Sequence, residues 1–144
     1  MQTKTKMLVA LVVVVSLGLV IAACGGSRSA HTPGVTVEDL TGLWQQEKTF
    51  MGQPYLQLNE DQTYRFATAV HSLETAPFEV GQYQLEGTSL TFIASNESFG
   101  CKGLRGSYEV ELTEEGQLQF VLQEDACGMR GVDLPARPWD RVEP

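Results

Sequence analysis

Histidine and cysteine are scarce in this sequence, which contains two histidines and three cysteines among 144 residues. No two cysteines have the C-x-x-C spacing of a zinc site, and no histidine lies near Cys101 or Cys127, so no metal site is expected. The sequence also lacks the short motifs of serine hydrolases, zinc proteases, phosphate-binding loops and dinucleotide-binding folds. We therefore expect neither an enzyme nor a bound cofactor.

His71 is the single histidine of the folded region and has Glu74 nearby in an expected loop. A histidine and a carboxylate together can act as a general base. A solvated loop histidine explains the same pair without any function, and we prefer that interpretation.

Positive charge is scarce too. Ten Lys and Arg residues stand against 18 Asp and Glu residues, which gives a formal net charge of −8. An acidic surface repels phosphate groups, so nucleic acid is not an expected partner. Solubility alone also accounts for such a balance.

The N-terminal region differs from the rest of the chain. Lys4 and Lys6 precede an almost wholly apolar run over residues 7–21, and Ala22 and Ala23 follow it. A positive start, an apolar run and a small-residue cleavage site are typical of a secretory signal peptide. Residues 7–23 also reach the lower limit for a membrane-spanning helix, so an uncleaved anchor and simple secretion are the alternatives.

The four residues Ile21-Ala22-Ala23-Cys24 resemble the bacterial lipobox, in which an aliphatic and two small residues precede a lipidated cysteine. The resemblance implies that residues 1–23 are a lipoprotein signal peptide and that Cys24 receives the lipid. Two or more acyl chains anchor a protein firmly. We therefore expect an exported, lipid-anchored protein of the bacterial cell envelope, with its domain outside the cytoplasm.

The region after Cys24 divides into a tether and one domain. Residues 24–35 are rich in Gly and Ser and predict a flexible tether. Residues 36–144 form the expected domain, which begins with a short helix because Thr36 can cap it and acidic residues follow.

From Gly42 onward apolar residues alternate with polar ones, which indicates β-strands with one buried face. The alternation slips at Gly81, which suggests a bulge or a bend there. We expect eight strands and no helix of useful length between them, at residues 42–48, 54–59, 63–70, 78–86, 89–94, 105–113, 117–124 and 137–143.

Long and short connections alternate between these strands. In an antiparallel meander every second connection lies at the same end, so the longer loops gather at one end and the tight turns at the other. Eight such strands tend to close into a barrel, which either fills with side chains or holds one small ligand. Cys101 and Cys127 lie in two of the long loops, and an even pair in an oxidising compartment predicts a disulfide worth on the order of 3–4 kcal/mol.

Gly42-Leu43-Trp44 stands at the start of the first strand and resembles the G-x-W signature of the lipocalin and wider calycin group. In those proteins the Trp lies at the closed end of the barrel and an Arg from the last strand covers it. The resemblance implies an all-β, eight-stranded up-and-down barrel in which Arg141 covers Trp44. The sequence departs from lipocalins in its short strands and in having no helix after the last one.

Several loop residues are candidates for a ligand-binding mouth. Some are apolar and could line an entrance or fold inward as a plug, and the basic ones could receive a carboxylate or phosphate or instead pair with Asp125 or Glu124. The candidate mouth comprises Phe50, Met51, His71, Leu73, Phe99, Lys102, Arg105, Met129 and Arg130.

Two functions remain open at this point. The first is non-catalytic binding of a small apolar or amphipathic ligand at the mouth by a monomer. The alternative is a protein-interaction or inhibitor module of the cell envelope. A dry cavity beneath the mouth would favour the first, and a filled barrel with exposed apolar loop residues would favour the second.

Overall fold

A computed structural model describes residues 34–49 and 51–143 of the chain. The expected signal peptide, Cys24, most of the tether and Phe50 lie outside the described residues. Within the described ranges, no helix is both long enough and apolar enough to cross a membrane.

Strands dominate the described part of the chain, and three short helices interrupt them. The strands are β1 (Gly42–Gln45), β2 (Tyr55–Leu58), β3 (Thr63–Ala67), β4 (Glu79–Glu86), β5 (Ser89–Ala94), β6 (Arg105–Leu112), β7 (Leu118–Asp125) and β8 (Asp140–Arg141). The helices are α1 (Val37–Leu40), α2 (Ser72–Thr75) and α3 (Gly128–Asp133).

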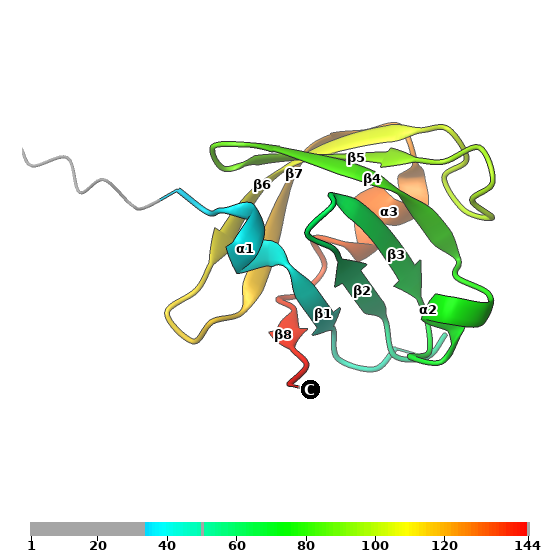
Figure 1. Ribbon diagram of the computed structural model, residues 1–144, viewed down its shortest axis with the longest axis horizontal. Coiled ribbons are helices and arrows are strands. Elements are labelled where there is room, and N and C mark those ends of the chain that lie inside the picture. Colours follow the sequence, from blue (N-terminus) through cyan, green and yellow to red (C-terminus); the bar gives the residue numbers. More distant parts are fainter. Residues whose placement is uncertain (1–33, 50, 144) are drawn as a thin grey trace, which may run out of the picture. The chain divides into compact units, whose positions relative to one another are not determined.

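The strands form one curled antiparallel sheet in the order β7-β6-β5-β4-β3-β2-β1-β8 (Figure 1). Each strand from β1 to β7 therefore pairs with its neighbours in sequence, and β8 returns to β1. This confirms the meander and the mostly-β fold class, in the form of a half-barrel. The two outer strands approach each other at a single bridge, Leu118–Trp139, which is closed by two backbone hydrogen bonds of 2.9 and 2.8 Å.

Only one of the three helices was expected from the sequence. Helix α1 is confirmed, and the Thr36 side chain and the Asp39 carboxylate form a reciprocal capping box at its start. Helices α2 and α3 lie in connections that were expected to be loops. Each is short, four and six residues, and tertiary contacts rather than helix propensity stabilise helices of this length.

The expected bulge at Gly81 is not found, because Gly81 pairs in regular register with both Tyr64 and Ala94. The register shift lies instead between Ser107 and Tyr108 of β6. A Cβ at Gly81 would lie 2.1 Å from the backbone oxygen of Ile93. Gly81 is thus required by the close approach of two backbones.

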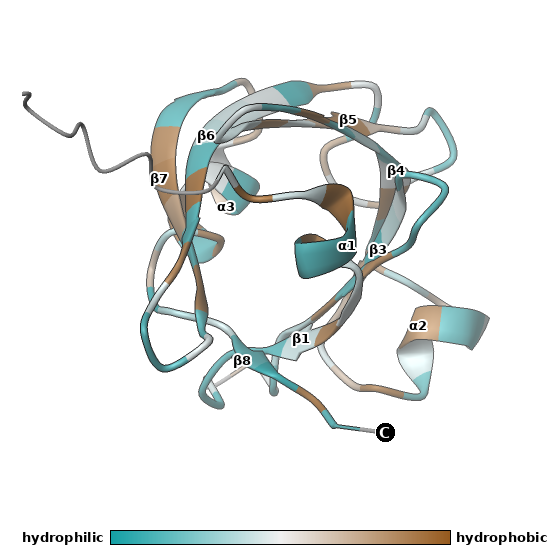
Figure 2. Cartoon of the chain, turned by 60° about the vertical axis from the view of Figure 1, so that its left-hand side comes forward, coloured by the Kyte–Doolittle hydropathy of each residue, from teal (hydrophilic) through white to brown (hydrophobic). Residues whose placement is uncertain are grey.

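The inner face of the curled sheet is filled with large side chains. The alternating apolar residues of β2 to β7 point inward and pack edge-to-face, for example Tyr64 on Phe92 and Tyr108 on Phe120. Helix α1 lies across one open end of the sheet, where Leu40 joins the core, and α3 lies at the other end (Figure 2). The interior is therefore closed at both ends by helices.

The closed end has the arrangement that the G-x-W resemblance implies. Trp44 is fully buried, its indole N–H donates to the Leu40 carbonyl oxygen, and the Arg141 guanidinium lies 4.2 Å from its ring centroid. Arg141 also donates to the carbonyl oxygens of Thr41 and Asp39 at the end of α1. At Gly42 φ is +143°, and a Cβ there would lie 2.6 Å from Nη1 of Arg141, which explains the glycine.

Removing the Arg141 side chain should destabilise the domain through this closed end. We expect Arg141→Ala to lower the free energy of unfolding by about 1–2 kcal/mol, because a cation–π contact and two hydrogen bonds to helix carbonyls disappear. Arg137→Ala is the matched control, since Arg137 pairs with Glu47 at the surface and such pairs contribute less than about 1 kcal/mol. Urea unfolding of both variants measures the difference, and equal losses would contradict this role for Arg141.

Candidate functional site at the long-loop end

A disulfide joins two of the long connections. Cys101, between β5 and β6, is bonded to Cys127, which immediately precedes α3, and their Cα atoms are 5.2 Å apart. The expected pairing is confirmed. It shows that these two loops share one end of the sheet, as the alternation of long and short connections predicts, and it fixes the start of α3 to the neighbouring loop.

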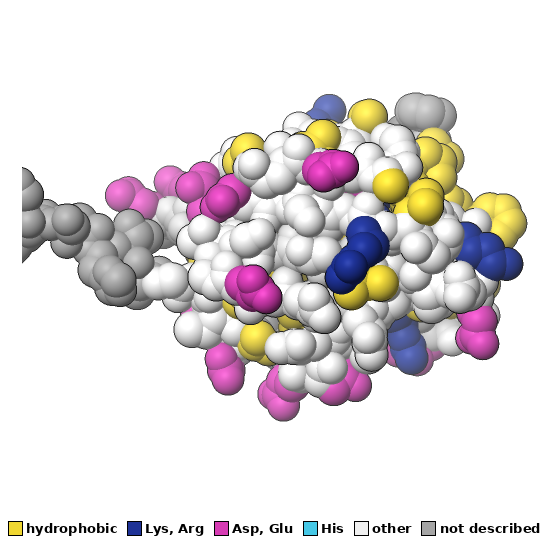
Figure 3. Space-filling view, turned by 90° about the horizontal axis from the view of Figure 1, so that it is seen from above, with side chains coloured by type: hydrophobic (Ala, Val, Ile, Leu, Met, Phe, Trp, Pro, Cys, Tyr) yellow, Lys and Arg dark blue, Asp and Glu magenta, His cyan; other side chains and the backbone are white. Residues whose placement is uncertain are grey.

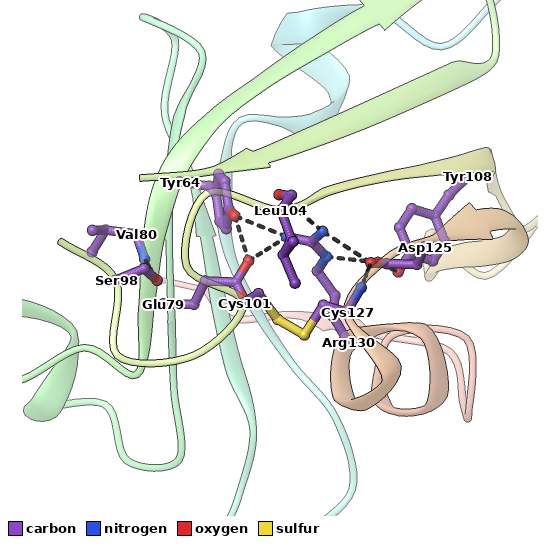
Figure 4. A network of polar contacts seen from close by, with 10 residues as sticks. All are labelled: Tyr64, Glu79, Val80, Ser98, Cys101, Leu104, Tyr108, Asp125, Cys127 and Arg130. Carbon is purple, nitrogen blue, oxygen red and sulfur yellow. Dashed lines mark hydrogen bonds and ion pairs between the residues drawn. A yellow bond between two sulfur atoms is a disulfide. The ribbon is translucent and has the colours of Figure 1, made fainter. Parts of the chain in front are cut away.

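Arg130 of α3 points into the interior and lies between two carboxylates (Figure 4). Its Nη1 is 2.6 Å from Oε1 of Glu79 on β4. Its Nε and Nη2 are 2.7 and 3.0 Å from the two carboxylate oxygens of Asp125 at the end of β7, which is a bidentate arrangement. All three side chains are buried.

Two tyrosines complete what we call the buried polar cluster, Tyr64, Glu79, Tyr108, Asp125 and Arg130. The Tyr64 hydroxyl donates to Glu79, and the Tyr108 hydroxyl donates to Asp125. Burial, followed by the adjacent carboxylate, raises the pKa of each tyrosine above its ordinary value, so both remain protonated donors. Burial alone lowers the pKa of Arg130, but its bonds to Asp125 and the charge of Glu79 outweigh burial and raise it.

The cluster satisfies its own polar atoms. The backbone N–H of Cys127 donates to Asp125 at 2.6 Å, and Nη2 of Arg130 also reaches the Leu104 carbonyl oxygen at 3.4 Å. In the described residues no buried side-chain polar atom lacks a hydrogen-bond partner. A charge taken out of water is tolerated only when it is paired and hydrogen-bonded in this way, so the cluster holds β4, β7 and α3 in one arrangement.

Only one pair of this cluster, Arg130 with Asp125, could be anticipated from the sequence. The pairing of Arg130 with Asp125 was one of the two explanations for the basic loop residues, and the structure confirms that pairing. Glu79 was missed, because it lies between the apolar residues Phe78 and Val80, whose alternation assigns those two residues to the buried face. The alternation at Tyr83 and Leu85 was the available signal, since the same phase continued back through Gly81 places Glu79 on the inner face.

A small cavity lies beneath α3, next to the buried polar cluster. Its volume is about 20 Å³, enough for roughly one water molecule. Small-molecule sites are typically about 300–1,000 Å³. Its walls are mostly apolar and comprise Leu56, Tyr64, Phe66, Phe78, Glu79, Phe92, Cys101, Met129, Arg130, Asp133 and Leu134.

Two residues of the candidate mouth do not line an open mouth. Leu73 is 4% exposed and packs under α2, because that helix turns its apolar residue inward. Arg130 is 6% exposed and belongs to the buried polar cluster, so it is not part of an open basic group. His71 is exposed at the start of α2, and Glu74 is bonded to Arg65 at 2.6 Å rather than to His71.

Of the remaining mouth residues that the structure describes, Met51, Phe99 and Met129 are exposed apolar residues, and Phe99 and Met129 both lie next to Phe78. Phe99 is 85% exposed, and its ring lies 5.6 Å from that of Phe78. Met129 also lines the cavity with Phe78, and Val132 lies three residues further along α3, on the same face. We call three exposed apolar residues around the disulfide, Phe99, Met129 and Val132, the apolar rim.

Charge is distributed unevenly around the domain. The exposed cations Lys102 and Arg105 lie in or beside the loop that carries Phe99. Figure 3 shows hydrophobic side chains gathered at the long-loop end beside basic ones, whereas many carboxylates lie toward the tight-turn end. Within residues 34–49 and 51–143, no group of three or more potential metal ligands occurs.

Comparison of the chain with protein-family models, curated proteins and solved structures found no match. Functional inference therefore depends on the chain's own residues.

Replacing Arg130 should strongly destabilise the domain. We expect Arg130→Met to cost about 3–5 kcal/mol, because two buried carboxylates lose their counter-charge. Lysine should recover only part of this, since it cannot form the bidentate contact with Asp125. Arg105→Met is the control, because an exposed substitution usually changes stability by less than about 0.5 kcal/mol. Chemical denaturation measures all three, and a native-like Arg130→Met would contradict the role of the cluster.

Proposed function

We propose that this protein is an exported, lipid-anchored binding module that contacts a partner protein through the apolar rim. The observation that carries the proposal is the combination of a filled interior with exposed apolar side chains at one end. Phe99, at 85% exposure, is the clearest example. An apolar group left in water by an otherwise well-packed domain commonly marks an interaction surface.

The interior argues against the alternative of a ligand held inside the sheet. A molecule larger than water would have to displace Met129 and move α3, which the disulfide and Arg130 both hold. Moving α3 would also separate Arg130 from its carboxylates. The small apolar or amphipathic ligand remains the second candidate because Met129, a flexible surface side chain, lines the cavity.

The rim has the properties of a protein-binding surface. Its residues stand on a segment that is fixed in place by a disulfide and by buried ion pairs, so little conformational entropy is lost when a partner binds. Aromatic and methionine side chains are enriched in protein interfaces, and charged side chains such as Lys102 suit the periphery. These features favour an interaction or inhibitor module.

The proposed anchor gives the rim a direction. Helix α1, near the start of the described chain, lies at the tight-turn end, opposite the apolar rim. A chain anchored through Cys24 would thus present the rim away from its own membrane. We also propose that the half-barrel is a closed, calycin-type barrel, which the Leu118–Trp139 bridge and the Trp44–Arg141 contact support.

Cross-linking from the rim tests the partner proposal. A photoreactive benzoylphenylalanine at position 99, introduced in the cell of origin, should form a discrete protein adduct identified by mass spectrometry. Adduct yield should fall at least about tenfold when Met129→Ser is added, because hot-spot contacts are each worth over ~1 kcal/mol and cluster together. Val70→Ser is the matched control, since Val70 and Met129 are both 50% exposed.

Two outcomes of the cross-linking experiment would contradict the partner proposal. Absence of any protein adduct at position 99 would contradict the partner proposal, as would an equal loss of adduct in the Met129→Ser and Val70→Ser variants. A small molecule retained by the native protein in mass spectrometry, and lost on Met129→Trp, would favour the ligand-binding function instead.

Metabolic labelling tests the anchor. We expect the native chain to incorporate radioactive palmitate and to partition into detergent, because two or more acyl chains bind a membrane firmly. Cys24→Ser should abolish labelling and leave the signal peptide uncleaved. Label retained by Cys24→Ser, or absent from the native chain, would contradict the lipoprotein proposal.

A further inference from the structure

Two exposed methionines carry the sulfur chemistry that is open to solvent in the described part of the chain. Met51 is 65% exposed and Met129 is 50% exposed. The two cysteines of this part form the disulfide, so neither is a free thiol. The other two methionines of the chain lie within residues 1–23, which the proposed cleavage would remove. A methionine thioether can be oxidised to the sulfoxide, and its susceptibility follows its exposure.

Met129 occupies a position that Met51 does not. It lies in α3, directly before Arg130, and it lines the cavity of about 20 Å³ beneath that helix together with Phe78. Met51 lies in the connection between β1 and β2 and does not line this cavity. One part of the Met129 side chain thus faces water while another part faces the cavity. A change in its polarity is therefore felt on both sides.

The cavity wall has no side-chain donor left for an added oxygen. Among the lining residues, the side chains with N–H or O–H groups are those of Tyr64 and Arg130. The Tyr64 hydroxyl donates to Glu79. All five N–H groups of Arg130 are engaged, with Glu79, Tyr64, the Leu104 carbonyl oxygen and both carboxylate oxygens of Asp125. A sulfoxide oxygen turned toward the cavity would thus be a buried acceptor without a partner, which is unfavourable.

We propose that Met129 is a modification site at which a peroxide oxidises the thioether and makes the apolar rim polar. The sulfur of Met129 forms a bond to one oxygen of hydrogen peroxide, the O–O bond breaks, and the other oxygen leaves as water with both protons. Sulfur loses two electrons and the peroxide gains them. Because the new oxygen has no donor on the cavity side, the side chain turns outward into water. The rim then carries a polar group in place of one of its three apolar side chains.

The consequence for binding rests on the proposed function of the apolar rim. A sulfoxide pressed against an apolar partner surface loses its water without gaining a hydrogen bond, so oxidation weakens the contact. The disulfide and the ion pairs of Arg130 hold α3 in place at the same time. Oxidation therefore changes the polarity of the rim while its shape is kept. The rim would bind its partner in the absence of oxidant and release it when peroxide is present.

Peroxide treatment followed by mass spectrometry of the folded chain tests the modification itself. We expect Met129 and Met51 to gain one oxygen each at rates that agree within about threefold, because their exposures are similar. Met51→Leu leaves Met129 as the one methionine of the processed chain, and that variant should still gain one oxygen. Oxidation of Met129 at least about tenfold slower than that of Met51 would overturn the proposal.

Nuclear Overhauser contacts of a methyl-labelled methionine test the outward turn. In the Met51→Leu variant the Met129 methyl group should show contacts to the ring protons of Phe78, because both side chains line the same small cavity. These contacts should be lost on oxidation, while the amide signals of α3 keep their dispersion. Contacts to Phe78 that survive oxidation would show that the sulfoxide stays in the cavity, and would overturn the proposed turn.

Cross-linking with and without peroxide tests the effect on binding. With benzoylphenylalanine at position 99, peroxide should lower the adduct yield of the Met51→Leu chain at least about tenfold. The matched control adds Met129→Leu, which stays apolar and cannot be oxidised, and its yield should not change. Equal losses in both chains would overturn the effect on binding. If neither chain gives an adduct even without peroxide, the partner proposal fails, whereas the first two measurements still decide whether Met129 is the modification site.

Discussion

The guanidinium of Arg130 is the interaction on which the long-loop end of this domain depends. It reaches Glu79 on β4 and Asp125 on β7 from a helix of only six residues, which could not form alone in water. Two buried carboxylates without it would carry a large desolvation penalty. The pairing therefore fixes where α3 lies, and α3 in turn carries Met129 and Val132 to the surface.

The Cys101–Cys127 disulfide also constrains the position of α3. Cys127 directly precedes α3, and its backbone N–H also donates to Asp125. A covalent bond and an ionic cluster thus constrain one short segment. At the closed end a second arginine, Arg141, lies over the Trp44 ring. It also donates a hydrogen bond to the carbonyl oxygen of Thr41, which directly follows α1. With helices at both ends and aromatic rings between them, the described interior is well packed around a cavity of about 20 Å³.

The last segment of the chain explains why β7 and β8, the two ends of the strand order, are joined so sparsely. β8 has two residues, and the segment before it contains Pro135 and Pro138. Proline cannot donate to a β-ladder, so in the described part of the chain β7 is joined to this segment by the single bridge Leu118–Trp139. The same shortage of donors explains why the sheet is a half-barrel in its hydrogen bonding.

The sequence alone determined the elements whose signals are local. Alternating apolar residues and turn residues indicate all eight strands, Thr36 indicates α1, and the alternation of loop lengths predicts the meander. The Cys101–Cys127 pairing follows from the two cysteines that remain besides Cys24. G-x-W and Arg141 predict the closed end. Only the tertiary structure decided that Glu79 faces inward, that α2 and α3 form, and that the interior is filled. These features depend on partners distant in the chain: Glu79 and Arg130 are compatible with a core only because they meet each other, and neither residue carries that information alone.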